Sequence, residues 1–239
     1  MLLYLQGVIF MNKKGNNKLI LYHGSNQIIS NPQYGKGRNT NDYGRGFYCT
    51  EHPELAGEWA CGMNTDGYVN KYSINSSGLK ILNLNADDYS VLNWLAVLLR
   101  YRMVAMNSPL MQSAREYICE KYYLDLSGYD IIRGYRADDS YFSFARAFVS
   151  NSISLEQLSA AMHPGNPGEQ IVIKSTAAFD RLKFIDAELA SREEFYVKKA
   201  ARDIEARNRY LKITEAFDAK GTYVSQLVSG EAGDYNESI

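Results

Sequence analysis

The sequence predicts an α+β fold with helical insertions and a helical C-terminal extension. Short β-type runs, bounded by Gly, Asn and Pro, occur near both ends of the first 186 residues. Between them, residues 87–123 and 140–162 carry apolar side chains at helical spacing. A highly charged segment at residues 191–214 has the pattern of one long surface helix. The chain of 239 residues is therefore expected to form one core and an appended helix.

Strands are expected where short apolar or alternating runs end at turn residues. The run LILYH is closed by Gly24 and Ser25, as in a buried strand that ends in a turn. The run VNKYSI at residues 69–74 instead alternates apolar and polar side chains, as in a half-buried strand. On these grounds, strands are predicted over residues 18–23, 47–50, 69–74, 80–84, 129–134, 169–174 and 182–185.

Helices are expected where apolar spacing follows a capping residue or a proline. Pro53 suits a first helical position, and either Asp87 or Asp88 can cap the next helix. Ser154 is followed by Gln157 at the third position of a capping box. Helices are therefore predicted to begin near residues 53, 88, 109, 140, 155, 176 and 191, and a dense Gly/Pro loop is predicted at residues 163–168.

Both ends of the chain are expected to lie outside the core. The apolar decamer at the start is interpreted as a strand or as an upstream extension before a start at Met11. No positive charge precedes the decamer and no cleavage site follows it, so a secretion signal is not expected. The last ten residues, GEAGDYNESI, are expected to be disordered. The predicted organisation is an extension (1–18), a main domain (19–186) and a helical extension with a tail (187–239).

Composition argues against several classes of protein. The formal net charge of -1 gives no general attraction to nucleic acid or to acidic membranes. Cys49, Cys61 and Cys119 have neither the number nor the spacing of a disulfide framework or a zinc site. No cluster of His, Cys and acidic residues has metal-ligand spacing, so no metal is expected. These features predict a cytoplasmic protein without a membrane partner.

Three side chains between residues 21 and 59 are predicted to form one cleft. His23 ends the first strand, Tyr48 lies on a second strand reached through two glycines, and Trp59 follows on the first helix. Each of them alone could be a structural histidine or a core aromatic residue. Their combination around a Gly- and Asn-rich loop favours a shared site over three separate structural roles.

The motifs of this region resemble those of a known enzyme group. His-Gly-Ser at residues 23–25, Gly-x-Gly-Phe-Tyr-x-Thr at residues 44–50, and an acidic or amide residue before a late β run occur in the order found in ADP-ribosyltransferases of the His-Tyr-Glu type. This group includes poly-ADP-ribose polymerases and diphtheria-like toxins. More closely, LYHGS, DYGRGFYCT, YVNKY, YDIIRGYRADD and EQIVIKS are similar to a bacterial family long described only as a domain of unknown function and grouped with that fold. The likeness covers about residues 19–186.

The resemblance implies an ADP-ribosyltransferase-like split β-sandwich that binds NAD as a co-substrate. In such enzymes the motif His bonds a ribose hydroxyl, and the backbone of the following Gly pairs with the nicotinamide carboxamide. The motif Tyr stacks on the nicotinamide, and a second ring can close the sandwich around this flat cation. Ala56 stands where polymerases often have a Ser that holds the carboxamide. The NAD-binding residues implied here are His23, Gly24, Ser25, Tyr48, Thr50 and Trp59.

The catalytic residue implied by the resemblance is open between two neighbours. Family enzymes place a Glu at the start of a late strand, and the form Glu-x-Ile-Val matches Glu169. The closer bacterial family favours Gln one position later, which matches Gln170. Strand alternation puts the two side chains on opposite faces, so only one can reach the cleft. A Glu would supply charge, whereas a Gln can bond a hydroxyl but cannot act as a general base.

The function that the resemblance implies is mono-ADP-ribosyl transfer. Nicotinamide would leave NAD, and the ADP-ribose would pass to an acceptor, either a protein or a nucleic acid. His23 and Glu169 or Gln170 would be the catalytic residues. The alternatives are an NAD glycohydrolase and a binding module of the same fold that holds NAD, an ADP-ribosyl group or a partner protein without turnover. The resemblance suits a toxin, a phage-defence factor or a housekeeping enzyme equally.

Overall fold

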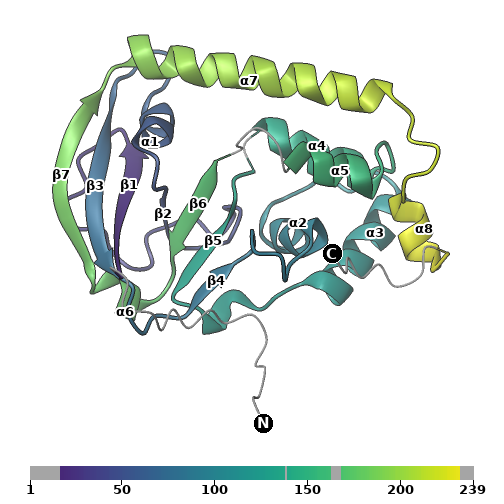
Figure 1. Ribbon diagram of the computed structural model, residues 1–239, viewed down its shortest axis with the longest axis horizontal. Helices are drawn as coiled ribbons and strands as arrows, with labels where there is room; N and C mark the ends of the chain where they lie inside the picture. Colours follow the sequence, from purple (N-terminus) through teal and green to yellow (C-terminus); the bar gives the residue numbers. More distant parts are fainter. Residues whose placement is uncertain (1–16, 138, 163–167, 232–239) are drawn as a thin grey trace.

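The computed structural model describes residues 17–137, 139–162 and 168–231. They form two small β-sheets, a helical lobe beside them and one long helix that reaches across both (Figure 1). The first sheet is antiparallel and has the order β1 (Lys18–Ser25), β3 (Gly67–Asn75), β7 (Leu182–Ala190). The second sheet has the order β2 (Phe47–Cys49), β6 (Glu169–Ile173), β5 (Ile131–Tyr135), β4 (Ile81–Asn83). In the second sheet β4 and β5 are parallel, and the other pairs are antiparallel.

The helices lie mostly to one side of the sheets, as Figure 1 shows. Helix α1 packs on the first sheet, α6 connects β6 to β7, and α2, α3, α4, α5 and α8 form the helical lobe. Their bounds are α1 (Pro53–Ala60), α2 (Val91–Tyr101), α3 (Pro109–Tyr122), α4 (Asp139–Val149), α5 (Leu155–Met162), α6 (Thr176–Phe179), α7 (Arg192–Glu215) and α8 (Val224–Ser229). A short 3-10 helix, Leu126–Gly128, precedes β5.

The two sheets are joined at one point and face each other through a small apolar core. Tyr22 of β1 and Thr50, just after β2, exchange two backbone hydrogen bonds of 2.7 and 2.9 Å. Beside this bridge, Leu21 and Ile74 of the first sheet share a core cluster with buried isoleucines of the second. The inter-sheet face of the second sheet is therefore the one that carries Ile131, Ile171 and Ile173.

The opposite face of the second sheet packs against the helical lobe. Helix α2 is buried on nearly every side, because its sequence VLNWLAVLLRY is apolar around most of its circumference. Trp94, one of its largest buried side chains, donates from its indole nitrogen to the backbone oxygen of Tyr135 on β5. Val172 of β6 belongs to this larger core, so β6 separates two cores with its two faces.

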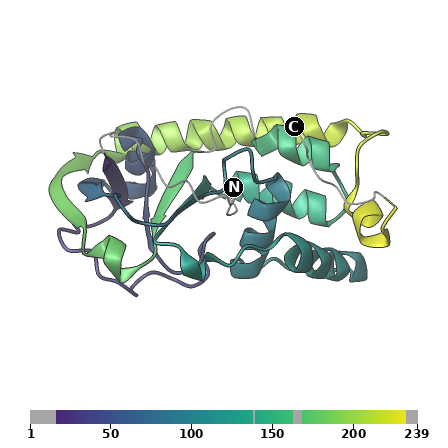
Figure 2. The ribbon, with the colours of Figure 1, turned by 60° about the horizontal axis from the view of Figure 1, so that its bottom comes forward.

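The long helix α7 connects the two parts of the molecule. Both views show it running from the sheets to the helical lobe (Figures 1 and 2). It contacts α1 beside the first sheet and α4 and α5 in the lobe. Arg202 of α7 donates to the carboxylate of Glu58 on α1 at 2.9 Å, and Glu58 is only 3% exposed. The sequence-predicted charged helix is thus present, and Ser191 caps it by accepting from Glu193 N.

Most elements agree with the α+β prediction, and the differences are local. Strand β7 extends to Ala190 because it pairs with β3 along its whole length, so the expected domain boundary at residue 186 lies within a strand. Helix α8 was not expected from the sequence. The N-terminal decamer, the loop at 163–167 and most of the tail lie outside the described residues. No helix in the described ranges is long and apolar enough to cross a membrane.

Candidate functional site

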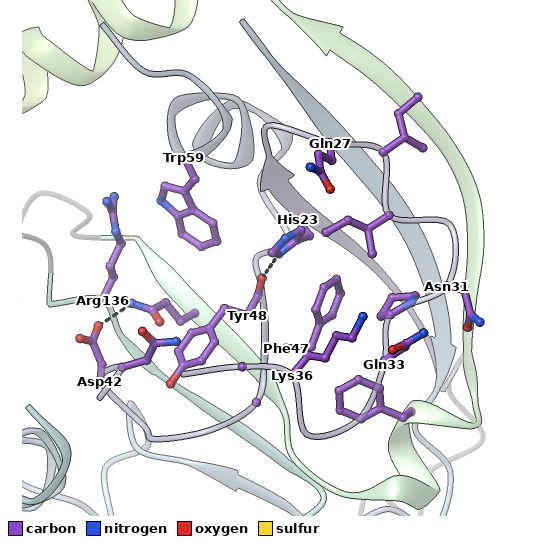
Figure 3. Close-up of a pocket in the computed structure, with 18 of the residues that line it drawn as sticks. His23, Gln27, Asn31, Gln33, Lys36, Asp42, Phe47, Tyr48, Trp59 and Arg136 are labelled. Carbon is purple, nitrogen blue, oxygen red and sulfur yellow. Dashed lines mark hydrogen bonds between the residues drawn. The ribbon is translucent and has the colours of Figure 1, made fainter. Parts of the chain in front are cut away.

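A cleft of about 840 Å³ lies beside β1, β2, helix α1 and the loop of residues 26–46. This volume is within the range of pockets that hold small molecules and cofactors. His23, Tyr48 and Trp59, the three side chains predicted to share a cleft, all line it. Figure 3 shows their rings around the same hollow, although they come from two strands and a helix.

His23 has a fixed orientation in this wall. Its Nδ1 lies 2.6 Å from the backbone oxygen of Tyr48, and its ring packs against Phe47 with 4.3 Å between centroids. A carbonyl oxygen only accepts hydrogen bonds, so Nδ1 carries the proton. Burial lowers the pKa of His23, and the hydrogen bond to Tyr48 only partly opposes this effect. In the neutral ring, Nε2 is then a hydrogen-bond acceptor, which suits a ligand hydroxyl.

Tyr48 is held by its hydroxyl, which leaves its ring as the functional part. The hydroxyl donates to the Gly44 oxygen at 2.6 Å and accepts from Tyr43 N at 3.0 Å. Burial is the largest cause of the raised pKa of this phenol, so it stays protonated at neutral pH. With the hydroxyl occupied by the loop, Tyr48 is suited to stacking rather than to proton transfer.

Trp59 supplies a second aromatic surface on helix α1. The guanidinium of Arg136 lies 5.3 Å from its ring centroid, in cation–π range. In Figure 3 this guanidinium and His23 lie on opposite sides of the indole. The indole nitrogen is buried and has no hydrogen-bond partner among the described residues. The ring is therefore held by packing and by Arg136 rather than by a bond from its own nitrogen.

The structure distinguishes between the two candidate catalytic residues by placing them on opposite faces of β6. Gln170 lines the cleft and is 5% exposed, on the same sheet face as Tyr48 because Tyr48 pairs with Val172. Glu169 does not line the cleft. Its carboxylate accepts from Arg133 at 2.7 Å and from Asn85 at 3.2 Å.

Glu169 belongs to an ion-paired group outside the cleft. Arg133 also bonds the carboxylate of Glu51, so one guanidinium serves two acids. The expectation that one of the two neighbours reaches the cleft is thus met by Gln170. The physical reason is the register of β6, which pairs Gln170 with Gly134 and Glu169 with Tyr135. A carboxylate on this strand is not available at the cleft.

Asp42 is a cleft residue that the sequence analysis did not identify. It is 6% exposed and comes from the loop before β2. Its carboxylate accepts from Gln170 Nε2 and from Ala137 N, both at 2.9 Å, and lies 3.4 Å from an Arg102 nitrogen. Burial raises the pKa of Asp42, whereas these hydrogen bonds and nearby arginines oppose the rise. The available signal was weak: one acid before the Tyr-Gly-Arg-Gly motif in an irregular loop.

Three other predicted NAD-binding residues do not line the cleft: Gly24, Ser25 and Thr50. A Cβ on Gly24 would lie 1.9 Å from the backbone oxygen of Ala56, so the close packing of helix α1 requires a glycine at this position. Ser25 Oγ accepts from Gln27 N. Thr50 is fully buried at the bridge between the two sheets. These residues position the cleft wall, and α1 explains the need for Gly24.

Among the described residues, the cleft lining carries more positive than negative side chains. Its lysines and arginines come from the loop of residues 26–46, from the end of α2, from the segment after β5 and from α7, and its acids are Asp42 and Asp203. The basic residues are Lys36, Arg102, Arg136 and Lys199. Such a lining suits an anionic ligand with a flat end. Within the described residues, no group of three or more His, Cys, Asp or Glu side chains is placed to hold a metal ion.

Comparison with known proteins identifies a family but no established activity. No match to this chain was found among curated proteins. The family model described as "Protein of unknown function (DUF3990)" matches residues 19–184, which include all but the first residue of β1, the elements from β2 to α6 and most of the cleft. That match covers well over half of the 239 residues. The chain therefore belongs to the DUF3990 family.

Proposed function

We propose that this chain is an NAD-dependent mono-ADP-ribosyltransferase with an ADP-ribosyltransferase-like split sandwich. The observation that carries the proposal is the convergence of His23, Tyr48, Trp59 and Gln170 on one cleft. These residues come from motifs that resemble the His-Tyr-Glu enzymes. Two sheets joined at a single bridge, with the cleft beside that bridge, are compatible with such a fold.

The chemistry of the wall fits the parts of NAD. The ring of Tyr48 and the face of Trp59 not taken by Arg136 offer aromatic surfaces for the flat, cationic nicotinamide. Nε2 of neutral His23 offers an acceptor for a ribose hydroxyl. The basic residues of the lining, such as Lys36 and Arg136, offer charge to the diphosphate.

In the proposed reaction, the bond between nicotinamide and the ribose carbon breaks and nicotinamide leaves with the bonding electron pair. The ribose carbon becomes oxocarbenium-like and is attacked by a lone pair of the acceptor, which then loses its proton. A carbonyl or carboxylate oxygen of the protein that lies near the ribose stabilises this positive charge more than it stabilises the ground state. Gln170 can hold the ribose but cannot take the acceptor's proton, so the acceptor should be a good nucleophile in its own right.

Two alternatives keep the same cleft. The turn of Glu169 away from the cleft, towards Arg133, favours weak or absent transfer, as in a module that binds NAD or ADP-ribose. If water alone reaches the ribose carbon, the protein is an NAD glycohydrolase. All three share NAD binding by His23 and Tyr48 and differ in the fate of the ADP-ribose.

The test uses the purified chain and NAD labelled on the adenine. Free nicotinamide and label bound to protein or nucleic acid are measured in cell lysate treated separately with protease and nuclease. Transfer predicts both nicotinamide release and bound label, hydrolysis predicts release with free ADP-ribose, and a binding module predicts only a higher melting temperature with NAD. No release of nicotinamide, and no change in melting temperature with either NAD or ADP-ribose, would exclude all three.

His23→Ala is the first variant for this assay. It removes the proposed ribose acceptor, and we expect NAD affinity to fall by about tenfold or more while the protein without NAD remains folded. His52→Ala is the matched control, because His52 is exposed and does not line the cleft. Unchanged NAD affinity in His23→Ala would contradict the proposed site.

A further inference from the structure

Asp42 and Gln170 form a buried pair at the cleft, in which Gln170 donates a hydrogen bond and Asp42 accepts it. Asp42 is nearly buried, and its Oδ2 lies 2.9 Å from Gln170 Nε2 (dashed line at Asp42 in Figure 3). An ionised carboxylate has only acceptor sites, so the NH₂ end of the amide must point to it. The carbonyl end, Oε1, then lies at the opposite corner of the amide.

The carbonyl end of Gln170 is the part available to a ligand. Oε1 accepts no hydrogen bond from any residue in the described part of the chain, whereas the NH₂ end is occupied by Asp42. Gln170 itself lines the cleft, on the sheet face of Tyr48. An isolated Gln can turn its amide over at little cost, and a neighbouring carboxylate removes that freedom.

Asp42 also keeps negative charge close to this amide. Burial raises the pKa of Asp42, but the hydrogen bonds from Gln170 and Ala137 N and the charges of Arg102 and Arg136 oppose this rise and favour the ionised form. A charged acceptor bonded to the NH₂ group polarises the amide, so the partial negative charge on Oε1 grows. Through the Gln170 amide, the buried carboxylate of Asp42 therefore increases the negative charge at the cleft, although by less than a carboxylate in the cleft itself would.

We propose that Asp42 is the positioning residue of the transfer reaction: its carboxylate fixes the Gln170 amide with Oε1 toward the ribose and supplies the negative charge that Glu169 does not bring to the cleft. This inference rests on the proposed function for its reaction, but its geometric part, the fixed amide, does not. It assigns a role to a loop acid 128 residues before Gln170 in the chain. It also explains how a Gln can stand at a position where charge is useful.

The first test of the pair uses the unaltered protein and no substrate. In a spectrum of ¹⁵N-labelled protein, the side-chain NH₂ of Gln170, assigned by its loss in Gln170→Met, should exchange its protons with water at least about tenfold more slowly than exposed Gln side chains. Exchange as fast as that of exposed side chains would overturn the fixed amide, whatever the protein's activity.

The second test is a swap of the two residues. In Asp42→Asn the NH₂ end loses its charged partner, and we expect kcat for nicotinamide release to fall by about tenfold or more. In Gln170→Glu two carboxylates meet, so one of them takes up a proton and activity falls near neutral pH. In the double variant the amide now at position 42 can donate to the carboxylate now at position 170. This restores the hydrogen bond in reverse, so the double variant's kcat should exceed that of both single variants.

Several outcomes overturn the inference without touching the proposed function. Asp42→Asn with wild-type kcat and KM would show that the charge is not used. A double variant no better than the product of the two single effects would show that the residues do not act as a pair. Asp88→Asn, an exposed acid outside the cleft, is the matched control. If the wild type releases no nicotinamide, the proposed function fails, and the exchange measurement still decides whether the amide is fixed.

Discussion

The two faces of strand β6 differ in how completely their polar side chains are bonded within the protein. On the inter-sheet face, Glu169 shares Arg133 with Glu51, and every charge has an opposite charge beside it. On the cleft face, Gln170 is neutral and only one end of its amide is bonded within the described chain. Adjacent residues thus serve two purposes, one structural and one open to a ligand. Position on the strand, rather than residue type, decides which side chain can do chemistry.

The cleft side also shifts two of its titratable side chains, His23 and Tyr48, toward their neutral forms. Burial lowers the pKa of His23 and raises that of Tyr48. Neutral groups next to a ligand can give or accept hydrogen bonds without the cost of removing a charge from water. On the ion-paired face, Glu51 and Glu169 instead share the guanidinium of Arg133. The three predictions that follow test this contrast.

The largest effect is expected from removing the side chains of the neighbours Glu169 and Gln170, one at a time. Gln170→Ala removes the cleft-side acceptor, and nicotinamide release should fall by about a hundredfold. Glu169→Ala leaves Arg133 paired with Glu51, so release should stay within about twofold and stability should fall by about 1 kcal/mol or less. Steady-state assays and thermal melts of both variants measure this difference. A larger loss of nicotinamide release in Glu169→Ala than in Gln170→Ala would mean that Glu169, rather than Gln170, acts in the reaction.

A smaller effect, on stability, is expected at the residue paired with Gln170. Gly134 has no room for a side chain, because a Cβ there would lie 2.2 Å from the hydroxyl of fully buried Tyr43. Gly134→Ala should therefore lower the free energy of unfolding by about 1–3 kcal/mol, measured by urea denaturation. Gly128→Ala is the control, since a Cβ there meets nothing within 4 Å. Equal stability of the two variants would mean that this face is loosely packed.

The smallest effect is a pH dependence from His23. Its pKa in the folded protein is below the ordinary value of 6.5, so the unfolded chain takes up this proton first. Stability contributed by neutral His23 is therefore present above pH 6.5 and is lost as pH falls through that value towards the folded pKa. Between about pH 7 and about pH 5, the wild type should lose more unfolding free energy than His23→Gln. Parallel curves for the two proteins would show that His23 is not shifted.

Much of this arrangement could be predicted from local patterns. The LYHGS run, the glycines before Tyr48 and the proline that begins α1 each have a meaning within a few residues, and together they indicated the cleft. Alternation along β6 also predicted that only one of Glu169 and Gln170 reaches it. Which of the two does so depends on how the second sheet sits between two cores, and no local pattern carries that information.

The remaining features depend on contacts between distant parts of the chain. Asp42 lies in a loop without periodicity, and its bond to Gln170 joins residues 128 positions apart. Gly24 also has a packing role, because the backbone oxygen of Ala56 lies where a Cβ would be, which only the packing of α1 could reveal. Strand β7 is longer than its apolar run because pairing with β3 stabilises exposed residues that have no apolar signal of their own.

Helix α7 makes the cleft depend on sequence that the family match does not include. Lys199 and Asp203 line the cleft, yet the match ends at residue 184. The same helix links α1 to the lobe, and its Arg202 compensates the buried acid next to Trp59. The helix therefore contacts both parts of the molecule that border the cleft and adds two charged side chains to its lining. Substitutions at Lys199 and Asp203 can accordingly change the charge of the cleft while the motifs around His23 and Tyr48 stay unchanged.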